Sequence, residues 1–199
     1  VGALAMASLL VWSLAWRWSF PDFLPQTWSL RGWVGAADGW LRALTHTVLL
    51  ALATVAISLV LAIAWLETGL KRSGGLIYAP LLVPQIGFLY GLNVGFLKIG
   101  LSGGYLAVIW AQSLFVFPYV MIALADPWRA LDPRILHVAA ALGAGRWRRL
   151  VAVRLPILLR PILTAAAIGV AVSVAQYLPT LFMGAGRIAT LTTEAVTLA

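Results

Sequence analysis

Cysteine is absent from the 199-residue chain, and charged residues make up only 10% of it. The absence of cysteine excludes disulfides, thiolate metal sites and thiol nucleophiles, and it leaves the cellular compartment open. The shortage of charge, together with 62% hydrophobic residues, excludes an ordinary soluble domain, in which roughly 45–50% of residues are apolar. Most of this chain is therefore expected to have lipid, and not water, as its solvent.

Residues that carry catalysis or hold metals are also scarce. The chain has two histidines, and His46 has no second histidine, cysteine or carboxylate at metal-ligand spacing. The sequence contains no nucleophile elbow, phosphate-binding loop or paired carboxylates. We therefore expect no active site, no metal site and no cofactor bound by this chain, and we expect it not to be an enzyme.

Long uncharged hydrophobic runs take up most of the sequence. Four of them can cross a hydrocarbon layer of about 30 Å and hold no charged side chain. They are Thr47–Leu66, Gly74–Leu97, Ile99–Ala125 and Pro161–Gly186, and a fifth run covers Val1–Trp16. The predicted fold class is all-α and transmembrane, with about five membrane-spanning helices. Because the sequence starts at Val1 and stops in mid-pattern, we expect residues 1–199 to be part of a single transmembrane domain whose final span lies outside it.

Basic residues are distributed unevenly between these runs. Nine of the fourteen lysines and arginines lie in two links, Glu67–Gly75 and Asp126–Arg160. The positive-inside rule then places both links and the N-terminus in the cytoplasm, and five crossings place the C-terminus outside. A net charge of +8 would suggest a nucleic-acid partner in a soluble protein. Here bilayer orientation explains the charge, and we expect no nucleic acid.

The longer link, residues 126–160, is predicted to form two short cytoplasmic helices. Asp132 can accept backbone N–H groups at a helix start, and Pro133 suits the first helical position. An apolar stripe follows at helical spacing, and Gly143 offers the left-handed conformation that ends such a helix. A second helix is predicted over Arg146–Arg154, with Pro156 ending it.

Two roles fit these helices. Arginine-rich amphipathic helices commonly lie on a membrane surface among anionic lipid headgroups. However, six of the seven residues from Ala139 to Gly145 are alanine or glycine. Such a run leaves a nearly bare backbone surface that another protein can approach closely. We therefore favour a docking element for a cytoplasmic protein.

The same link carries a spaced motif, His137-Val-Ala-Ala-Ala-Leu-Gly143, then nine residues, then Val153-Arg-Leu-Pro156. It resembles the EAA signature of binding-protein-dependent, type I ABC importer permeases with a MetI-like transmembrane domain: Glu-Ala-Ala, three residues, Gly, nine residues, Ile, any residue, Leu-Pro. His137 stands where the family has Glu, and Val138 stands where it has the first Ala. The segment Ser173–Phe182 is also similar to the C-terminal half of fused, thiamine-type permeases.

The resemblance implies a half-permease of six helices whose loop is a coupling helix held by a cytoplasmic ABC ATPase. That ATPase binds the ATP and magnesium. The resemblance also implies a second permease half, an extracytoplasmic solute-binding protein and a bacterial-type inner membrane. The residues implied to serve the ATPase-coupling loop are Asp132, His137, Val138, Ala139, Gly143, Arg146, Trp147, Leu155 and Pro156.

The central spans hold neutral polar residues but no charged ones. Proton- or ion-coupled carriers usually place an ionisable group in mid-membrane, so an external ATPase is the expected energy source. Glu67 lies at a cytoplasmic end of a span, where we expect it to be solvated beside headgroups. Several of the amides Gln85, Asn93, Gln112 and Gln176 are expected to face a solute pathway, although each could instead hydrogen-bond between helices.

Two other functions are weighed against an importer subunit. A channel or secondary carrier would need a charged or carbonyl-lined site at mid-membrane, and a membrane-embedded enzyme would need a catalytic constellation. The sequence presents neither. It leaves the solute open, with thiamine-like compounds, polyamines, iron and anions all compatible with it.

The glycine that ends the first cytoplasmic helix provides a test of the docking role. Replacing Gly143 with a bulky residue should uncouple transport while the protein still inserts, because the partner would no longer approach the loop closely. Solute uptake and membrane insertion are the two measurements. Normal uptake by an inserted variant would count against docking at this loop.

Overall fold

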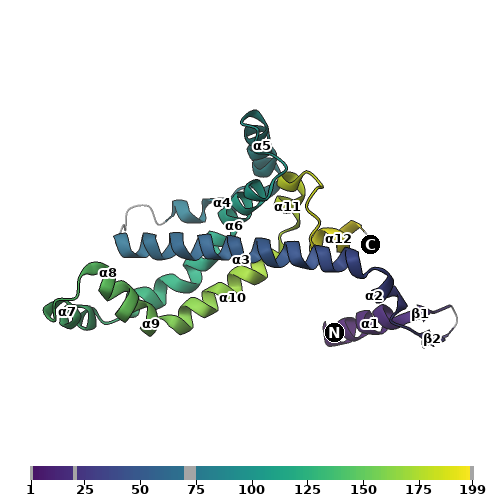
Figure 1. Cartoon of the computed structure of the whole chain (residues 1–199), viewed down its shortest axis with the longest axis horizontal. Helices are drawn as coiled ribbons and strands as arrows, with labels where there is room; N and C mark the ends of the chain where they lie inside the picture. The colour runs from purple at the N-terminus through teal and green to yellow at the C-terminus, as the bar shows by residue number, and fades with distance from the viewer. Residues whose placement is uncertain (1, 20–21, 70–74, 198–199) are drawn as a thin grey trace. The chain divides into compact units, whose positions relative to one another are not determined.

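The computed structural model describes residues 2–19, 22–69 and 75–197 (Figure 1). The chain divides into two compact units, Val1–Arg42 and Ala43–Ala199. The predicted link residues Lys71 and Arg72 lie outside the described part. Each unit is described by itself.

The first unit is a short helix followed by a hairpin. Helix α1 covers Gly2–Leu14, and β1 (Ala15–Arg17) pairs antiparallel with β2 (Thr27–Trp28) before α2 (Arg31–Gly35). The helix predicted over Val1–Trp16 therefore ends at Leu14, because the next residues extend and pair with β2. Its 13 residues rise about 20 Å, which is short of a hydrocarbon layer of about 30 Å.

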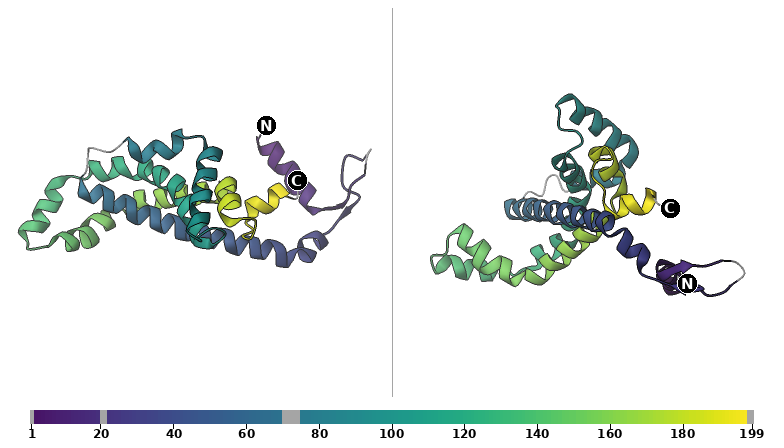
Figure 2. Two further views of the ribbon diagram at one scale, coloured as in Figure 1. Left: turned by 90° about the horizontal axis from the view of Figure 1, so that it is seen from above. Right: turned by 45° about the vertical axis from the view of Figure 1, so that its right-hand side comes forward.

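Two long helices and a third that packs against them form the main core of the second unit. Helix α3 covers Ala37–Thr68, α6 covers Tyr105–Ala130 and α10 covers Leu159–Ala175. Figure 1 shows α6 and α10 at an oblique angle to α3, and Figure 2 gives two further views. Val55 of α3, Val116 and Val120 of α6 and Ala165 of α10 are buried together in one apolar cluster.

Two described helices, α3 and α6, are long and apolar enough to cross a membrane. A third candidate is the pair Arg146–Ile157 and Leu159–Ala175, which is bent by 75° at the break between its helices. The predicted all-α transmembrane class is confirmed, although fewer single helices reach membrane length than the five runs suggested. The difference arises because two runs are broken and the first is short.

The run predicted over Gly74–Leu97 forms several pieces. These are η1 (Leu76–Tyr78), α4 (Ala79–Leu82) and α5 (Gln85–Lys98), and α4 and α5 point in different directions (Figure 1). The break falls at Val83, whose backbone is extended, directly before Pro84. Proline lacks an N–H and disfavours helical geometry in the residue before it, which favours a break in the helix at this position.

The run predicted over Pro161–Gly186 is broken in the same way. Helix α10 ends at Ala175, Gln176 is extended, and α11 covers Tyr177–Gly184 before α12 (Leu191–Thr197). Pro179 is the third residue of α11, within the first turn, where a missing N–H costs nothing. A second apolar cluster, with Leu50, Leu89, Val108 and Met183, joins α11 to α3, α5 and α6.

Close packing at Gly169 of α10 yields a testable prediction. A Cβ atom at this position would lie 3.0 Å from Cγ2 of Val55 and 3.2 Å from Cγ2 of Val120. Gly169→Leu should therefore lower the free energy of unfolding by about 1–3 kcal/mol, as overpacked cores usually do. Thermal denaturation in detergent would measure it. Gly91→Leu on α5 is the matched control, because nothing lies within 4 Å of a Cβ there.

Candidate functional site

The helix predicted to start at Asp132 and Pro133 forms as the sequence predicts. Helix α7 covers Pro133–Ala141, and Oδ1 of Asp132 accepts the backbone N–H of Arg134 at 2.8 Å. At the other end Gly143 has a φ of +81°, and its N–H donates to the carbonyl of Ala140 at 2.9 Å. These local bonds satisfy both ends of a short helix, so α7 can hold its shape while most of it projects into solvent.

The second helix departs from the prediction at its end. It runs as α8 (Arg146–Arg149), the π-helix η2 (Leu150–Arg154) and α9 (Leu155–Ile157). Pro156 therefore does not end it. The N–H of Leu155 bonds to the carbonyl of Leu150, five residues back, and this wider turn accommodates the proline that follows. The helix breaks instead at Leu158, which is buried in the core.

An apolar face of this loop is exposed. Leu142 is 84% exposed, Trp147 77% and Val138 61%. His137, Gly143, Arg146 and Pro156 are also exposed, whereas Ala139 and Leu155 are half-buried. The apolar stripe expected on this helix thus points largely away from the rest of the described chain. Large exposed apolar side chains with basic neighbours form the kind of surface that a protein partner covers.

Glu67 is paired, and our expectation of a solvated carboxylate was wrong. Its Oε1 accepts Nη1 of Arg154 at 2.5 Å, and its backbone carbonyl accepts Nη2 of Arg146 at 3.4 Å. The Arg154 guanidinium also lies 4.5 Å from the ring centroid of Trp128. Sequence reasoning missed this pair because its members are 87 residues apart. The one available signal was the predicted location of Glu67 on the same side of the membrane as an arginine-rich loop.

Gln112 is the centre of a buried hydrogen-bond network. It is 2% exposed, and its Oε1 accepts hydroxyls of Ser173 at 2.7 Å and Thr54 at 3.3 Å. Its Nε2 donates to Thr180 Oγ1 at 2.8 Å. One amide therefore joins α3, α6, α10 and α11. Its contacts are those of a residue that hydrogen-bonds between helices, the second of the two roles considered for it. Its place on a solute pathway stays a prediction.

A pocket of about 450 Å³ lies at the two helix breaks. Gln85, the first residue of α5, and Gln176, the residue before α11, both line it, together with Tyr119 and Tyr177. Asn93 lies elsewhere on α5, where its Oδ1 accepts the Ser102 hydroxyl at 3.3 Å. The structure thus brings together two of the four amides predicted for a pathway, and neither Asn93 nor Gln112 lines this pocket.

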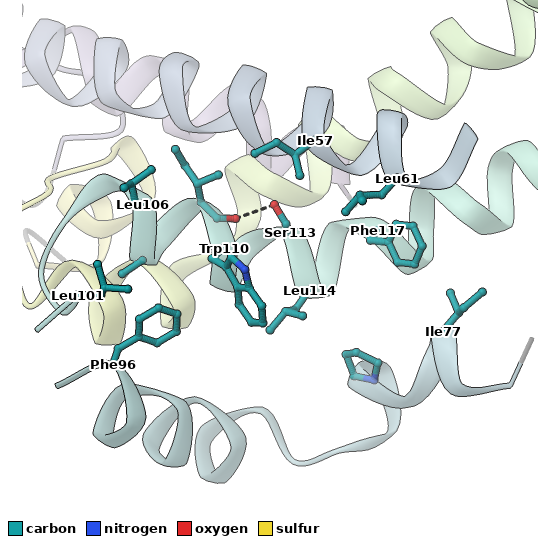
Figure 3. Close-up of a pocket in the computed structure, with 13 residues that line it drawn as sticks. Ile57, Leu61, Ile77, Phe96, Leu101, Leu106, Trp110, Ser113, Leu114 and Phe117 are labelled. Atoms are coloured by element: carbon teal, nitrogen blue, oxygen red, sulfur yellow. Dashed lines mark hydrogen bonds between the residues drawn. The ribbon is translucent and has the colours of Figure 1, made fainter. Parts of the chain in front are cut away.

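A second pocket, of about 590 Å³, is almost wholly apolar. Figure 3 shows Ile57 and Leu61 of α3 opposite Phe96 of α5, with Trp110 of α6 between Ile57 and Phe96 and Phe117 of α6 beside Leu61. The hydroxyl of Ser113, which also lines it, is already bonded to the carbonyl of Ile109 at 2.7 Å. This pocket therefore offers little to a polar solute, and the pocket at the helix breaks suits one better.

The Gln112 network provides a test of what holds the four helices together. Gln112→Leu should lower the free energy of unfolding by about 1–3 kcal/mol, because buried hydroxyls lose their partner. The matched control is Gln85→Leu, since Gln85 is only half-buried at the rim of a pocket. Thermal denaturation of both variants in detergent would compare them. Equal stability would mean that the network contributes nothing measurable.

Comparisons with known proteins identify the family. Residues 32–198 match the family of binding-protein-dependent transport system inner membrane components. The chain is 39% identical over 157 residues to the "Inner membrane ABC transporter permease protein YnjC" of Escherichia coli, covering 79% of this chain and 31% of that protein. It is 26% identical over 183 residues to the "Putative 2-aminoethylphosphonate transport system permease protein PhnV" of Salmonella typhimurium, covering 87% of this chain and 68% of that protein.

The family match covers α2 to α12, including the motif-bearing loop and both helix breaks. The chain spans about a third of the length of its Escherichia coli relative, 31%. The resemblance found in the loop signature is confirmed by these matches. The chain belongs to the binding-protein-dependent transport system inner membrane components, the inner-membrane permeases of ABC transporters.

Proposed function

We propose that this chain is a transmembrane subunit of an ATP-driven importer and that residues 131–158, the coupling loop, dock into a cytoplasmic ATPase. The observation that carries the proposal is the exposure of three large apolar side chains, Val138 and Leu142 at the locally capped helix α7 and Trp147 on α8. Such a face is costly in water and is stabilised when a partner covers it. The ATPase binds the ATP and magnesium, while this chain binds neither.

The other partners and the orientation follow from the family and from charge. A second permease half completes the transmembrane unit, and an extracytoplasmic binding protein delivers the solute. The basic residues of the coupling loop support a cytoplasmic location for the loop and for the N-terminus, by the positive-inside rule. Closure of the ATPase moves the loop, and the helices then alternate between inward and outward access.

The solute passes the pocket at the helix breaks, where Gln85 and Gln176 contact its polar groups. No charged side chain lines this pocket. A neutral lining favours weak hydrogen bonding, and a site on a transport path must release its solute as readily as it admits it. The proposal leaves the solute class open. The name of the PhnV relative includes a phosphonate, and this name describes that protein and not this chain.

Docking through the exposed face is tested by copurification of the ATPase. Leu142→Asp should reduce the amount of ATPase recovered by about tenfold or more, because a buried interface leucine would be replaced by a charge. The variant should still fold, since Leu142 is 84% exposed.

The matched control is Ile99→Asp, which adds the same charge to a side chain 66% exposed at the far end of α5. It should retain the ATPase. Full recovery with Leu142→Asp would contradict docking at this face, and a correctly inserted native chain that binds no ATPase would contradict the proposed function as a whole.

A further inference from the structure

The coupling loop is joined by the chain to two of the three core helices. It follows α6 directly and leads directly into α10. Helix α3 has no such link, because its chain continues past Thr68 toward η1. Any movement of the loop can therefore reach α3 only through side-chain and backbone contacts across space.

Arg154 makes contacts of this kind, and its guanidinium group interacts with α3 and α6 in three ways. Its Nη1 donates to Glu67, one residue before the end of α3. Its Nη2 donates to the carbonyl of Trp128, near the end of α6, at 3.4 Å. Its Cζ lies over the indole of the same tryptophan, 4.5 Å from the ring centroid. One side chain of the loop thus contacts both long helices at their ends.

These contacts are shielded from water. The Arg154 and Glu67 side chains are 18% and 16% exposed, and Trp128 is 2% exposed within the main core cluster. Partial burial strengthens an ion pair relative to one in bulk water, and a planar guanidinium can bond and stack at once where an ammonium cannot. The attraction of a cation to an indole face adds to both.

The backbone connection between the coupling loop and α10 is, by contrast, poorly suited to transmitting movement. Arg154 lies in a π-turn, and the helix that contains it breaks at Leu158 with a bend of 75° before α10 begins. Helix breaks and π-turns permit hinge motion, and π-turns are frequent at the functional sites of proteins. A rigid transfer of movement therefore needs contacts beside the backbone.

We propose that Arg154, Glu67 and Trp128 form a clamp that makes α3 and α6 move as one body with the coupling loop. The inference rests on the proposed function and adds the route by which the ATPase reaches α3. Arg154 and Glu67 act as positioning residues, because they touch neither the solute nor the nucleotide. The arginine in question occupies the unspecified position of the Val153-Arg-Leu-Pro156 motif.

The surroundings of Glu67 predict which substitution is the more severe. Arg146 and Arg149 line the same small pocket as Glu67 and Arg154. If Arg154 is neutralised, another arginine can still approach the carboxylate. If Glu67 is neutralised, three arginines lose their only described acidic neighbour in that pocket. Glu67→Gln should therefore loosen the loop more than Arg154→Gln does.

The absence of cysteine makes a distance measurement direct. Spin labels on Leu52→Cys in α3 and Ala152→Cys in η2 place one probe on each side of the clamp, and both positions are exposed. The labelled chain is purified with its ATPase, without nucleotide and trapped with ATP and vanadate. With the clamp intact, one narrow distance distribution is expected in both states.

Glu67→Gln should broaden the distribution and make it depend on nucleotide, because loss of one partner of a shielded ion pair raises the separated population by about tenfold or more. Arg154→Gln should do the same to a smaller degree, and it provides a second test if Glu67→Gln does not insert. ATPase recovery should remain unchanged in both, since the exposed docking face is intact. Asp126→Asn and Arg160→Gln are matched controls on exposed cytoplasmic residues and should behave as the native chain.

Distributions in Glu67→Gln and Arg154→Gln identical to that of the native chain would overturn the clamp. Loss of ATPase from either variant would also overturn it, because the residues would then serve docking and not transmission. If the native chain itself binds no ATPase, the proposed function fails. The nucleotide-free distribution would still decide whether Glu67 and Arg154 hold α3 to the loop.

Discussion

Within a hydrocarbon layer a backbone polar group finds no water, so every N–H and carbonyl must be satisfied by the protein itself. Two of the long apolar runs nevertheless break, one before Pro84 and one at Gln176. Such breaks are tolerated only where protein surrounds them or where they line a polar cavity. Both lie at one pocket, lined by Gln85 and Gln176, and the hydrogen-bond network of Gln112 lies directly beside it. The pocket therefore lies where lipid tolerates broken helices, at a polar cavity surrounded by protein.

The second unit is held at two levels by different chemistry. Near the breaks, neutral amide and hydroxyl groups join four helices through Gln112. At the C-terminal ends of α3 and α6, a shielded ion pair and a cation–π contact centre on Arg154. Among the described residues at these two levels, charged side chains are found only around Arg154 and not around Gln112. Placing an ion at the centre of a membrane costs much more free energy than placing a neutral amide there.

The loop that bears the family motif combines local rigidity with an open surface. Asp132 and Gly143 close the ends of α7 with bonds to its own backbone, so the helix needs little support from the rest of the chain. Its large apolar side chains are consequently free to face a partner. His137 is exposed on the same helix, where the family has glutamate, so the substitution introduces no buried charge or cavity within this chain.

Much of this could be read from the sequence because its causes are local. Apolar runs identify membrane helices, and Asp132-Pro133 and Gly143 mark the ends of α7 through bonds that span only a few residues. The loop motif identified the family for the same reason, since its spacing is continuous in the chain. The partners of Glu67 and Gln112 could not be read, because they lie 87 and 58 to 68 residues away, and nothing local selects them. The prediction that the second loop helix ends at Pro156 was wrong for a related reason. Whether a proline ends a helix depends on the turn before it, and here a π-turn lets the helix continue to Ile157. Local stereochemistry determined the helices and the signature, while packing across the core decided which side chains meet.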